Sequence, residues 1–206
     1  LCIMLAPPPP TVLKLSSRLR HFKNDIRIGN FKDKRLIHYP EGAWLLHDSR
    51  TERACLWTEH YQLARELAYL CALSRAGLML DRKRLHRVHA SAISLNGRSA
   101  VICGASGSGK STISLLLALE KEAALFSDDF PLTDRRGMLY PFPARPAISE
   151  DNPIAGRNLP FRTLERRTHG RKILLSTSLF TTPKPAQADY LILLAPVQAQ
   201  TPVLLP

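Results

Sequence analysis

The sequence predicts a mixed α/β fold organised around a strand, a glycine-rich loop and a helix that follow one another directly. Residues 99–103 form a short apolar run, as expected of a buried strand that enters the loop. Residues 111–121 are rich in helix-forming residues and predict the helix that leaves it. A further apolar run at residues 123–126 predicts another buried strand. Together these segments favour a layered α/β core.

The loop itself, Gly104–Ser111, has the spacing of a P-loop: a glycine, four residues, and then Gly-Lys-Ser. The glycines let the backbone curl so that its N–H groups surround a phosphate. Lys110 can reach the outer phosphates, the Ser111 hydroxyl can bind the Mg²⁺ that accompanies a nucleotide, and the helix adds its positive dipole end. The loop therefore predicts ATP–Mg²⁺ binding by Gly104, Ala105, Ser106, Gly107, Ser108, Gly109, Lys110, Ser111 and Thr112.

A turn signal precedes the loop strand. Asn96-Gly97 separates two strand-like runs, and this dipeptide is the strongest short-range indicator of a β-hairpin. The loop strand is therefore predicted to be the second arm of a hairpin, a topology that differs from that of Ras-like and kinase-like P-loop proteins.

Two adjacent carboxylates, Asp128 and Asp129, follow the strand predicted at residues 123–126. Adjacent parallel strands bring their carboxyl ends to the same edge of a sheet, where ligands bind. We therefore expect both acids beside the Gly104–Ser111 loop; the alternative is a turn with two solvated aspartates.

An accessory region at residues 1–85 is expected ahead of the loop-containing domain at residues 86–206. Pro7 to Pro10 predict an extended polyproline linker, and residues 12–57 predict short strands joined by turns. Residues 59–76 predict a helix that ends at Gly77 and packs a core-facing leucine stripe, made of Leu63, Leu67, Leu70 and Leu73.

The chain of 206 residues carries a formal net charge of +12, which favours anionic partners such as nucleotide phosphates, an acidic protein or nucleic acid. Aromatic residues make up only 7%, so the stacking surface typical of single-strand binding is thin and nucleic acid is not the expected partner. The basic run at residues 81–87 is interpreted as a solvated face rather than a polyanion site. The basic segment at residues 151–172 fits either a mobile loop over the site or a solvated segment.

Cysteine usage and hydropathy predict a cytoplasmic protein without a membrane partner. The four cysteines are scattered without metal-like pairing, which fits reduced thiols, and no stretch is long enough to span a membrane. The first residue is Leu1 and the last residues, 204–206, are apolar, so we expect that residues are missing at one or both ends.

Four motifs together resemble the catalytic domain of the HPr kinase/phosphorylase family. They are His89-Ala-Ser-Ala, the Asn-Gly turn, Gly-Ala-Ser-Gly-Ser-Gly-Lys-Ser-Thr and the following Ser-Asp-Asp. The resemblance is strongest from His89 to Asp129 and extends more weakly to residues 141–146. It implies a P-loop kinase core of the HPr kinase and phosphoenolpyruvate carboxykinase type. It also implies transfer of the γ-phosphate of ATP to a serine hydroxyl, with Mg²⁺ as the metal ion.

The resemblance also implies roles for individual residues. Asp128 would be the base that accepts the proton of the acceptor hydroxyl, and an ordinary carboxylate pKa suffices because that proton leaves late. Asp129 would hold the metal together with Ser111, and His89 would lie near the phosphates and the acid pair. A cationic group is expected to meet the transferring phosphate, with Arg145 as the first candidate and Arg157 and Arg162 as alternatives.

Two features depart from the family. Ala105 stands where the family has an acidic residue, and the Arg-Gly-rich signature linked to phosphorylase activity and HPr contact has no clear counterpart. The expected acceptor is therefore a serine of a protein or peptide, such as a ribosomal lasso-peptide precursor or an HPr-like protein. The founding family forms hexamers, so the resemblance leaves a homo-oligomer open, but the sequence does not fix the oligomeric state. A small-molecule kinase on the same scaffold and a nucleotide-dependent regulatory module without transfer activity are the alternatives.

Overall fold

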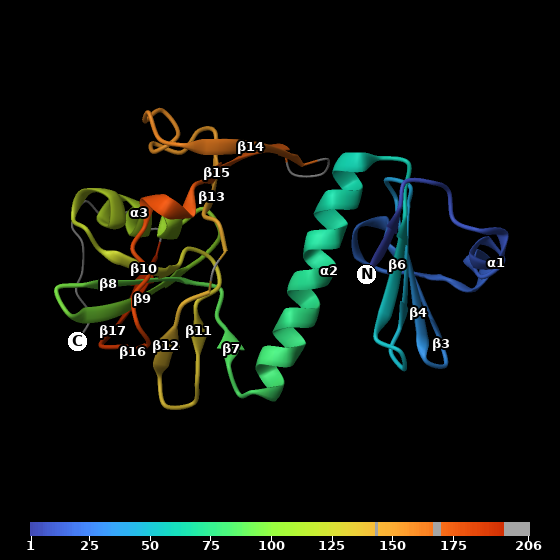
Figure 1. The fold of residues 1–206 in the computed structure, drawn as a ribbon, viewed down its shortest axis with the longest axis horizontal. Helices are drawn as coiled ribbons and strands as arrows, with labels where there is room; N and C mark the ends of the chain where they lie inside the picture. Colours follow the sequence, from blue (N-terminus) through green and yellow to red (C-terminus); the bar gives the residue numbers. More distant parts are fainter. Residues whose placement is uncertain (143, 167–169, 196–206) are drawn as a thin grey trace. The chain divides into compact units, whose positions relative to one another are not determined.

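The computed structural model describes residues 1–142, 144–166 and 170–195, and it divides into two compact units. Unit 1 comprises Leu1–Ala76 and Arg166–Gly170, and unit 2 comprises Gly77–Glu165 and the chain from Arg171 onward. Strands dominate and helices are few, so the mixed α/β class is confirmed (Figure 1). The division between the units falls within a helix, and the domain boundary expected between residues 85 and 86 stays a prediction.

Unit 1 is built on a six-stranded sheet in the order β1-β6-β5-β4-β3-β2. Its neighbouring strands are antiparallel except for β1 and β6, which run parallel. The strands expected within residues 12–57 are confirmed. The six strands are β1 (Cys2–Met4), β2 (Arg20–His21), β3 (Arg27–Phe31), β4 (Lys34–Tyr39), β5 (Ala43–Asp48) and β6 (Arg53–Trp57).

Each face of this sheet buries its own apolar cluster, because side chains alternate along a strand. One cluster contains Trp44 and Trp57, and Val12 of α1 (Pro10–Leu13) belongs to it. The short 3-10 turns η1 (Ser16–Arg18) and η2 (Lys23–Asp25) follow α1. Because Pro10 is the first residue of α1, the extended linker predicted through Pro10 is wrong at its last residue.

The opposite face packs against α2 (Tyr61–Arg82), through a cluster that includes Leu45, Leu63 and Leu67. The expected helix is confirmed, but two details differ. Leu70 is 43% exposed, so the predicted leucine stripe is shorter than expected. The predicted end at Gly77 is wrong, since the helix continues to Arg82. A Cβ at Gly77 would overlap the Arg87 guanidinium, so this glycine makes room for a side chain rather than ending the helix.

Unit 2 is organised around a four-stranded sheet in the order β10-β8-β9-β17. These strands are β8 (Ser91–Leu95), β9 (Arg98–Gly104), β10 (Ala124–Ser127) and β17 (Tyr190–Leu194). The predicted hairpin is confirmed: β8 and β9 pair in antiparallel register around Asn96 and Gly97, whose φ angles are 50° and 75°. β9 and β10 are not adjacent strands, because β8 lies between them.

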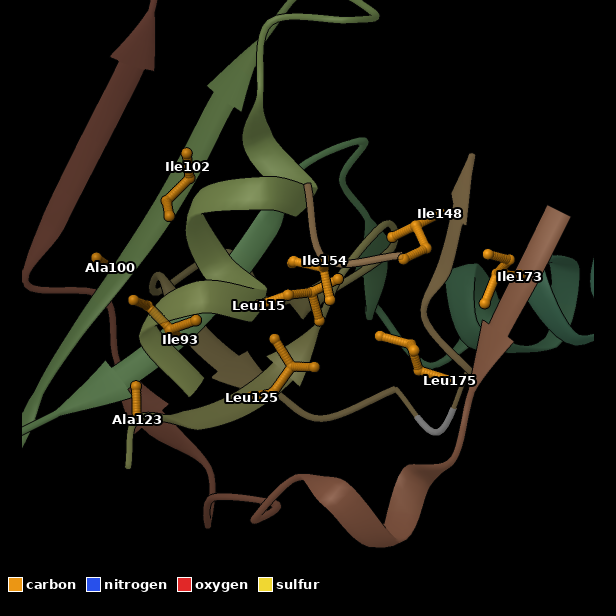
Figure 2. Packing of buried hydrophobic residues seen from close by; sticks show 10 residues of the cluster. All are labelled: Ile93, Ala100, Ile102, Leu115, Ala123, Leu125, Ile148, Ile154, Ile173 and Leu175. Atoms are coloured by element: carbon orange, nitrogen blue, oxygen red, sulfur yellow. The ribbon is translucent and has the colours of Figure 1, made fainter. Parts of the chain in front are cut away.

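The two faces of this sheet are covered differently. α3 (Lys110–Glu120) packs on one face, where Leu115 contacts a cluster that includes Ile93, Ile102 and Leu125 (Figure 2). The alternate residues Ala92, Val101 and Phe126 point to the other face and pack against Leu139 of a second sheet. That sheet has the order β16-β12-β11-β7, formed by β7 (His86–Arg87), β11 (Leu132–Thr133), β12 (Met138–Tyr140) and β16 (Ala186–Gln187).

The remaining elements of unit 2 include part of a third sheet in the order β13-β15-β14, followed by η3 (Thr177–Leu179). Its strands are β13 (Ala147–Ser149), β14 (Phe161–Arg166) and β15 (Gly170–Leu175). The segment expected as a loop or solvated stretch at 151–172 therefore contains β14 and the start of β15, while its residues 167–169 lie outside the described part. In the described residues, no helix is both long and apolar enough to cross a membrane.

Candidate active site

The Gly104–Ser111 loop joins β9 directly to α3, as the sequence predicts. Gly109 has φ 93°, a left-handed conformation that favours glycine, and it immediately precedes the helix. At Gly104 a Cβ would lie 2.7 Å from the carbonyl oxygen of Leu194 on β17. The neighbouring strand therefore approaches the loop too closely for any side chain at Gly104.

Polar atoms converge on this loop. The Lys110 ammonium donates hydrogen bonds to the carbonyl oxygens of Gly104 and Ala105, each at 2.9 Å. The buried Ser108 hydroxyl has no hydrogen-bond partner among the described residues. The first backbone N–H groups of α3 have no acceptor within the helix. Ammonium, hydroxyl and N–H groups together make a donor-rich end of a helix, which is the chemistry of an anion site.

Asp128 lies against α3 and is only 6% exposed. Its Oδ1 accepts hydrogen bonds from the hydroxyls of Ser91, at 3.1 Å, and Ser114, at 3.4 Å. The Ser91 Oγ also lies 2.5 Å from the main-chain oxygen of Asp128. Burial raises the pKa of Asp128, and hydrogen bonds from Ser111 and Ser91 oppose that rise. The environment of Asp128 therefore differs from that of a solvated aspartate.

Asp129 is in a different environment from its neighbour. Its side chain is 52% exposed, and its Oδ1 lies 2.9 Å from Nδ1 of His89, whose side chain is 60% exposed. The imidazole also lies beside the Phe130 ring, with 5.9 Å between the ring centroids. Asp129 and His89 thus form a carboxylate–imidazole pair that a molecule in solvent can reach.

The sheet topology explains why these groups gather. β8 is antiparallel to both β9 and β10, so β9 and β10 run in the same direction and end at one edge of the sheet. β8 starts at that edge, which places His89 and Ser91 there as well. Asp128 therefore lies beside α3, the helix that leaves the loop, with its Oδ1 3.4 Å from the Ser114 hydroxyl, although a strand separates β9 from β10. Asp129 follows β10 at the same edge and pairs with His89.

The arginine candidates are not joined to this cluster by any interaction among the described residues. Arg145 is exposed, and its segment is tied to β10 by a backbone hydrogen bond from Phe142 to Phe126 of 3.0 Å. Arg157 pairs with Glu120 at 2.5 Å. Glu120 is the last residue of α3, about 15 Å of helix from the loop. Arg162 is exposed on β14.

Sequence reasoning did not single out Ser91 and Ser114 as site residues. Both are 0% exposed, which is uncommon for serine, and both hydroxyls lie within hydrogen-bond distance of the Asp128 carboxylate. Ser114 follows Ser111 by three residues, so the two lie on the same side of a helix. The three-residue spacing was the sequence feature that could have indicated Ser114 as a site residue. Only the topology shows that the Asp128 carboxylate lies against this side of α3.

The oxygen atoms beside the loop fit Mg²⁺. No group of three or more His, Cys, Asp or Glu side chains that could hold a metal occurs in the described residues. Mg²⁺ that travels with a nucleotide is usually bound by one or two carboxylates, phosphate oxygens and water. The Ser111 hydroxyl at the start of α3 and the Asp128 carboxylate, which meets the same helix at Ser114, are hard oxygen donors of this kind.

A scan against protein-family models found no match for this chain, and a search of curated proteins found no match either. The resemblance to the HPr kinase/phosphorylase family therefore stays a prediction that rests on the motifs themselves.

Proposed function

We propose that this chain is an ATP-dependent kinase with an HPr-kinase-like P-loop core, which transfers the γ-phosphate to a serine hydroxyl of a protein or peptide. The observation that carries the proposal is the meeting of three groups at one sheet edge. These are the donor-rich Gly104–Ser111 loop, the buried carboxylate of Asp128, and the exposed pair of Asp129 and His89. Phosphoryl transfer depends mainly on positioning and charge stabilisation, and these groups supply both.

The contacts favour exchanging the roles that the resemblance implies for the two acids. Asp128 is nearly buried and meets α3 at Ser114, one turn after Ser111, so it suits the side where the metal would bind. Asp129 is about half exposed, so an acceptor hydroxyl arriving from solvent can reach it. Asp129 is therefore the proposed base, and His89 holds its carboxylate in place.

In the proposed reaction, the acceptor serine oxygen forms a bond to the γ-phosphorus while the bond to the β–γ bridging oxygen breaks. The serine proton passes to the Asp129 carboxylate, and ADP leaves with the electron pair of the broken bond. A bound Mg²⁺ would supply charge neutralisation at the phosphate oxygens. Lys110 would turn from the loop carbonyls to the phosphates, and the N–H groups of the loop would orient them.

The test is to incubate the purified chain with γ-labelled ATP, Mg²⁺ and a lysate of the source cell, and to identify the labelled species. We expect label on serine of a protein or peptide. Lys110→Ala should remove the labelling, whereas Lys121→Ala, at an exposed lysine just after the same helix, should retain it. Label on a small molecule would overturn the proposed acceptor, and ATP binding without any labelling would favour the regulatory module.

The cationic group is tested separately. If Arg145 meets the transferring phosphate, Arg145→Ala should lower turnover by roughly 10³-fold, as removal of an arginine finger does. Arg157→Ala is the matched control because that guanidinium is engaged with Glu120. Turnover of Arg145→Ala within twofold to threefold of the parent would exclude this role for Arg145.

A further inference from the structure

We propose that Ser91 and Ser114 are positioning residues that hold the Asp128 carboxylate against the metal-binding side of the Gly104–Ser111 loop. This inference rests on the proposed function and adds two residues to it. Neither serine would touch the nucleotide or the acceptor, because both act through Asp128.

Three elements meet at this carboxylate. Ser91 opens β8, Ser114 lies one turn after Ser111 on α3, and Asp128 directly follows β10. Ser91 and Ser114 are each 0% exposed, and both approach the same carboxylate oxygen, Oδ1. The Ser114 hydroxyl also lies 3.2 Å from the main-chain oxygen of Ser111, so it links the carboxylate to the first turn of α3. A rotation that moves Oδ1 away would lose the contacts to both hydroxyls.

The position of Ser91 also restrains the backbone of Asp128. Its Oγ lies 2.5 Å from the main-chain oxygen of Asp128 and 3.1 Å from Oδ1. One hydroxyl thus spans the main chain and the side chain of the same residue. Since β10 has a register irregularity between Leu125 and Ser127, the strand ladder does not by itself set the direction in which Asp128 leaves the strand.

A purely structural role makes a different prediction from a positioning role. If the serines only satisfy a buried carboxylate, their loss weakens the fold and the loop together. If they position Asp128, their loss weakens metal binding while the loop keeps its affinity for the nucleotide without metal. The metal dependence of nucleotide binding separates these two roles, and it does not require turnover.

The experiment measures the Mn²⁺ affinity of the full chain, saturated with a non-hydrolysable ATP analogue, by electron paramagnetic resonance. Calorimetry with the same analogue in EDTA gives the metal-free affinity. We expect Ser91→Ala and Ser114→Ala to raise the half-saturating Mn²⁺ concentration roughly tenfold each, the effect of losing one hydrogen bond to a charged group. The metal-free affinity should stay within twofold of the parent.

Two further variants control the result. Ser99→Ala removes a hydroxyl that is also buried in this sheet but has no hydrogen-bond partner among the described residues, and it should leave Mn²⁺ affinity unchanged. Ser114→Thr keeps the hydroxyl and should restore most of the parental Mn²⁺ affinity. If an alanine variant fails to fold, the cysteine variant at the same position keeps the size and replaces the hydroxyl with a weak donor.

Parental Mn²⁺ affinity in both alanine variants would overturn the positioning role. A parallel loss of metal-free nucleotide affinity would overturn it too, because the serines would then support the loop as a whole. A parent chain that binds neither the analogue nor Mn²⁺ would instead overturn the proposed function, so the two failures are distinguishable.

Discussion

Neighbouring residues of one chemical type can have different roles because burial and partners differ, and Asp128 and Asp129 illustrate this. Asp128 is 6% exposed and held by serine hydroxyls, whereas the Asp129 side chain is 52% exposed and paired with His89. A carboxylate of the first kind has a fixed direction, and one of the second kind is accessible to a second substrate. The sequence, in which the two aspartates are simply neighbours, reveals neither the difference in burial nor the difference in partners.

Asp129→Asn keeps the shape of the side chain and removes the proton acceptor. We expect nearly parental affinity for ATP–Mg²⁺ and a loss of transfer of about 10²- to 10⁴-fold, the usual contribution of a general base. Asp128→Asn should instead raise the Mg²⁺ concentration needed for half-maximal nucleotide binding. Calorimetric titration and the labelling assay measure the two effects. The opposite pattern would restore the roles implied by the family resemblance.

His38 predicts a pH dependence of stability in unit 1. The Arg27 guanidinium lies 3.1 Å from Nδ1 of His38, and burial, followed by the charge of Arg27, lowers the pKa of His38 while Glu41 opposes this. A lowered pKa favours the neutral imidazole in the folded chain. The stability this contributes is present above the unfolded pKa of about 6.5 and is lost as pH falls towards the folded pKa.

The measurement is the urea midpoint of unfolding between pH 8 and pH 5, compared for the parent and His38→Gln. The midpoint of the parent should fall more steeply as pH decreases. The slope should not vanish in the variant, because burial also lowers the pKa of His47. His21→Gln, at an exposed position on β2, is the control. Equal slopes in the parent and His38→Gln would contradict the prediction.

At the scale of elements, the pairing of β9 with β17 depends on a single missing side chain. Leu194 lies opposite Gly104 in parallel register, and a Cβ at Gly104 would lie 2.7 Å from the Leu194 carbonyl oxygen. The Cβ would also lie 2.5 Å from the Ser108 hydroxyl, a short side chain that can turn aside. The Leu194 carbonyl is backbone, so removing that overlap requires the strands to separate. The loop that follows Gly104 would then lose its support from β17.

Gly104→Ala should therefore lower the free energy of unfolding by about 1–3 kcal/mol, as overpacking in a closely packed site does. It should also weaken nucleotide binding at the loop. Gly156→Ala is the control, because a Cβ there meets nothing within 4 Å and the backbone is not left-handed. Chemical denaturation of both variants measures the difference. If Gly104→Ala is as stable as Gly156→Ala, β17 can move away from Gly104 without a loss of unfolding free energy, and the prediction is wrong.

At the scale of the whole molecule, the apolar interior is divided between the two units. Unit 1 buries clusters on both faces of its sheet. In unit 2, the largest cluster of the described residues joins α3 and the central sheet to β13 and β15 of the third sheet. The candidate site lies entirely within unit 2. A ligand that binds there stabilises the structure that forms the site, by an amount that mass action sets.

Hydrogen exchange followed by mass spectrometry measures this distribution. At a nucleotide concentration of about 100 times its dissociation constant, the free energy of exchange of amides in β9 and α3 should increase by up to ~2.7 kcal/mol. The full increase applies to amides that exchange only when unit 2 unfolds. Protection of β4 and β5 in unit 1 should change much less. Equal protection of both units would mean that they unfold as one cooperative structure.

The sequence by itself determined the local elements whose signals are short-range. The Asn96-Gly97 turn, the strand and helix on either side of Gly104–Ser111, and the strand before Asp128 all follow from nearest-neighbour backbone preferences and hydrophobic runs. The same preferences were misleading at Gly77, where the glycine accommodates Arg87 inside a helix instead of ending it.

Only the tertiary structure decided which elements are neighbours and which polar groups share a site. Strand order depends on long-range pairing, and the position of β8 between β9 and β10 brings His89 and Ser91 to the edge where the loop and the acids lie. Burial is likewise a property of the packed chain: it separates Asp128 from Asp129 and directs Ser114 towards a carboxylate 14 residues away. Residue type and spacing specify what each group can do, but contact and solvent exposure determine which of those roles it can have.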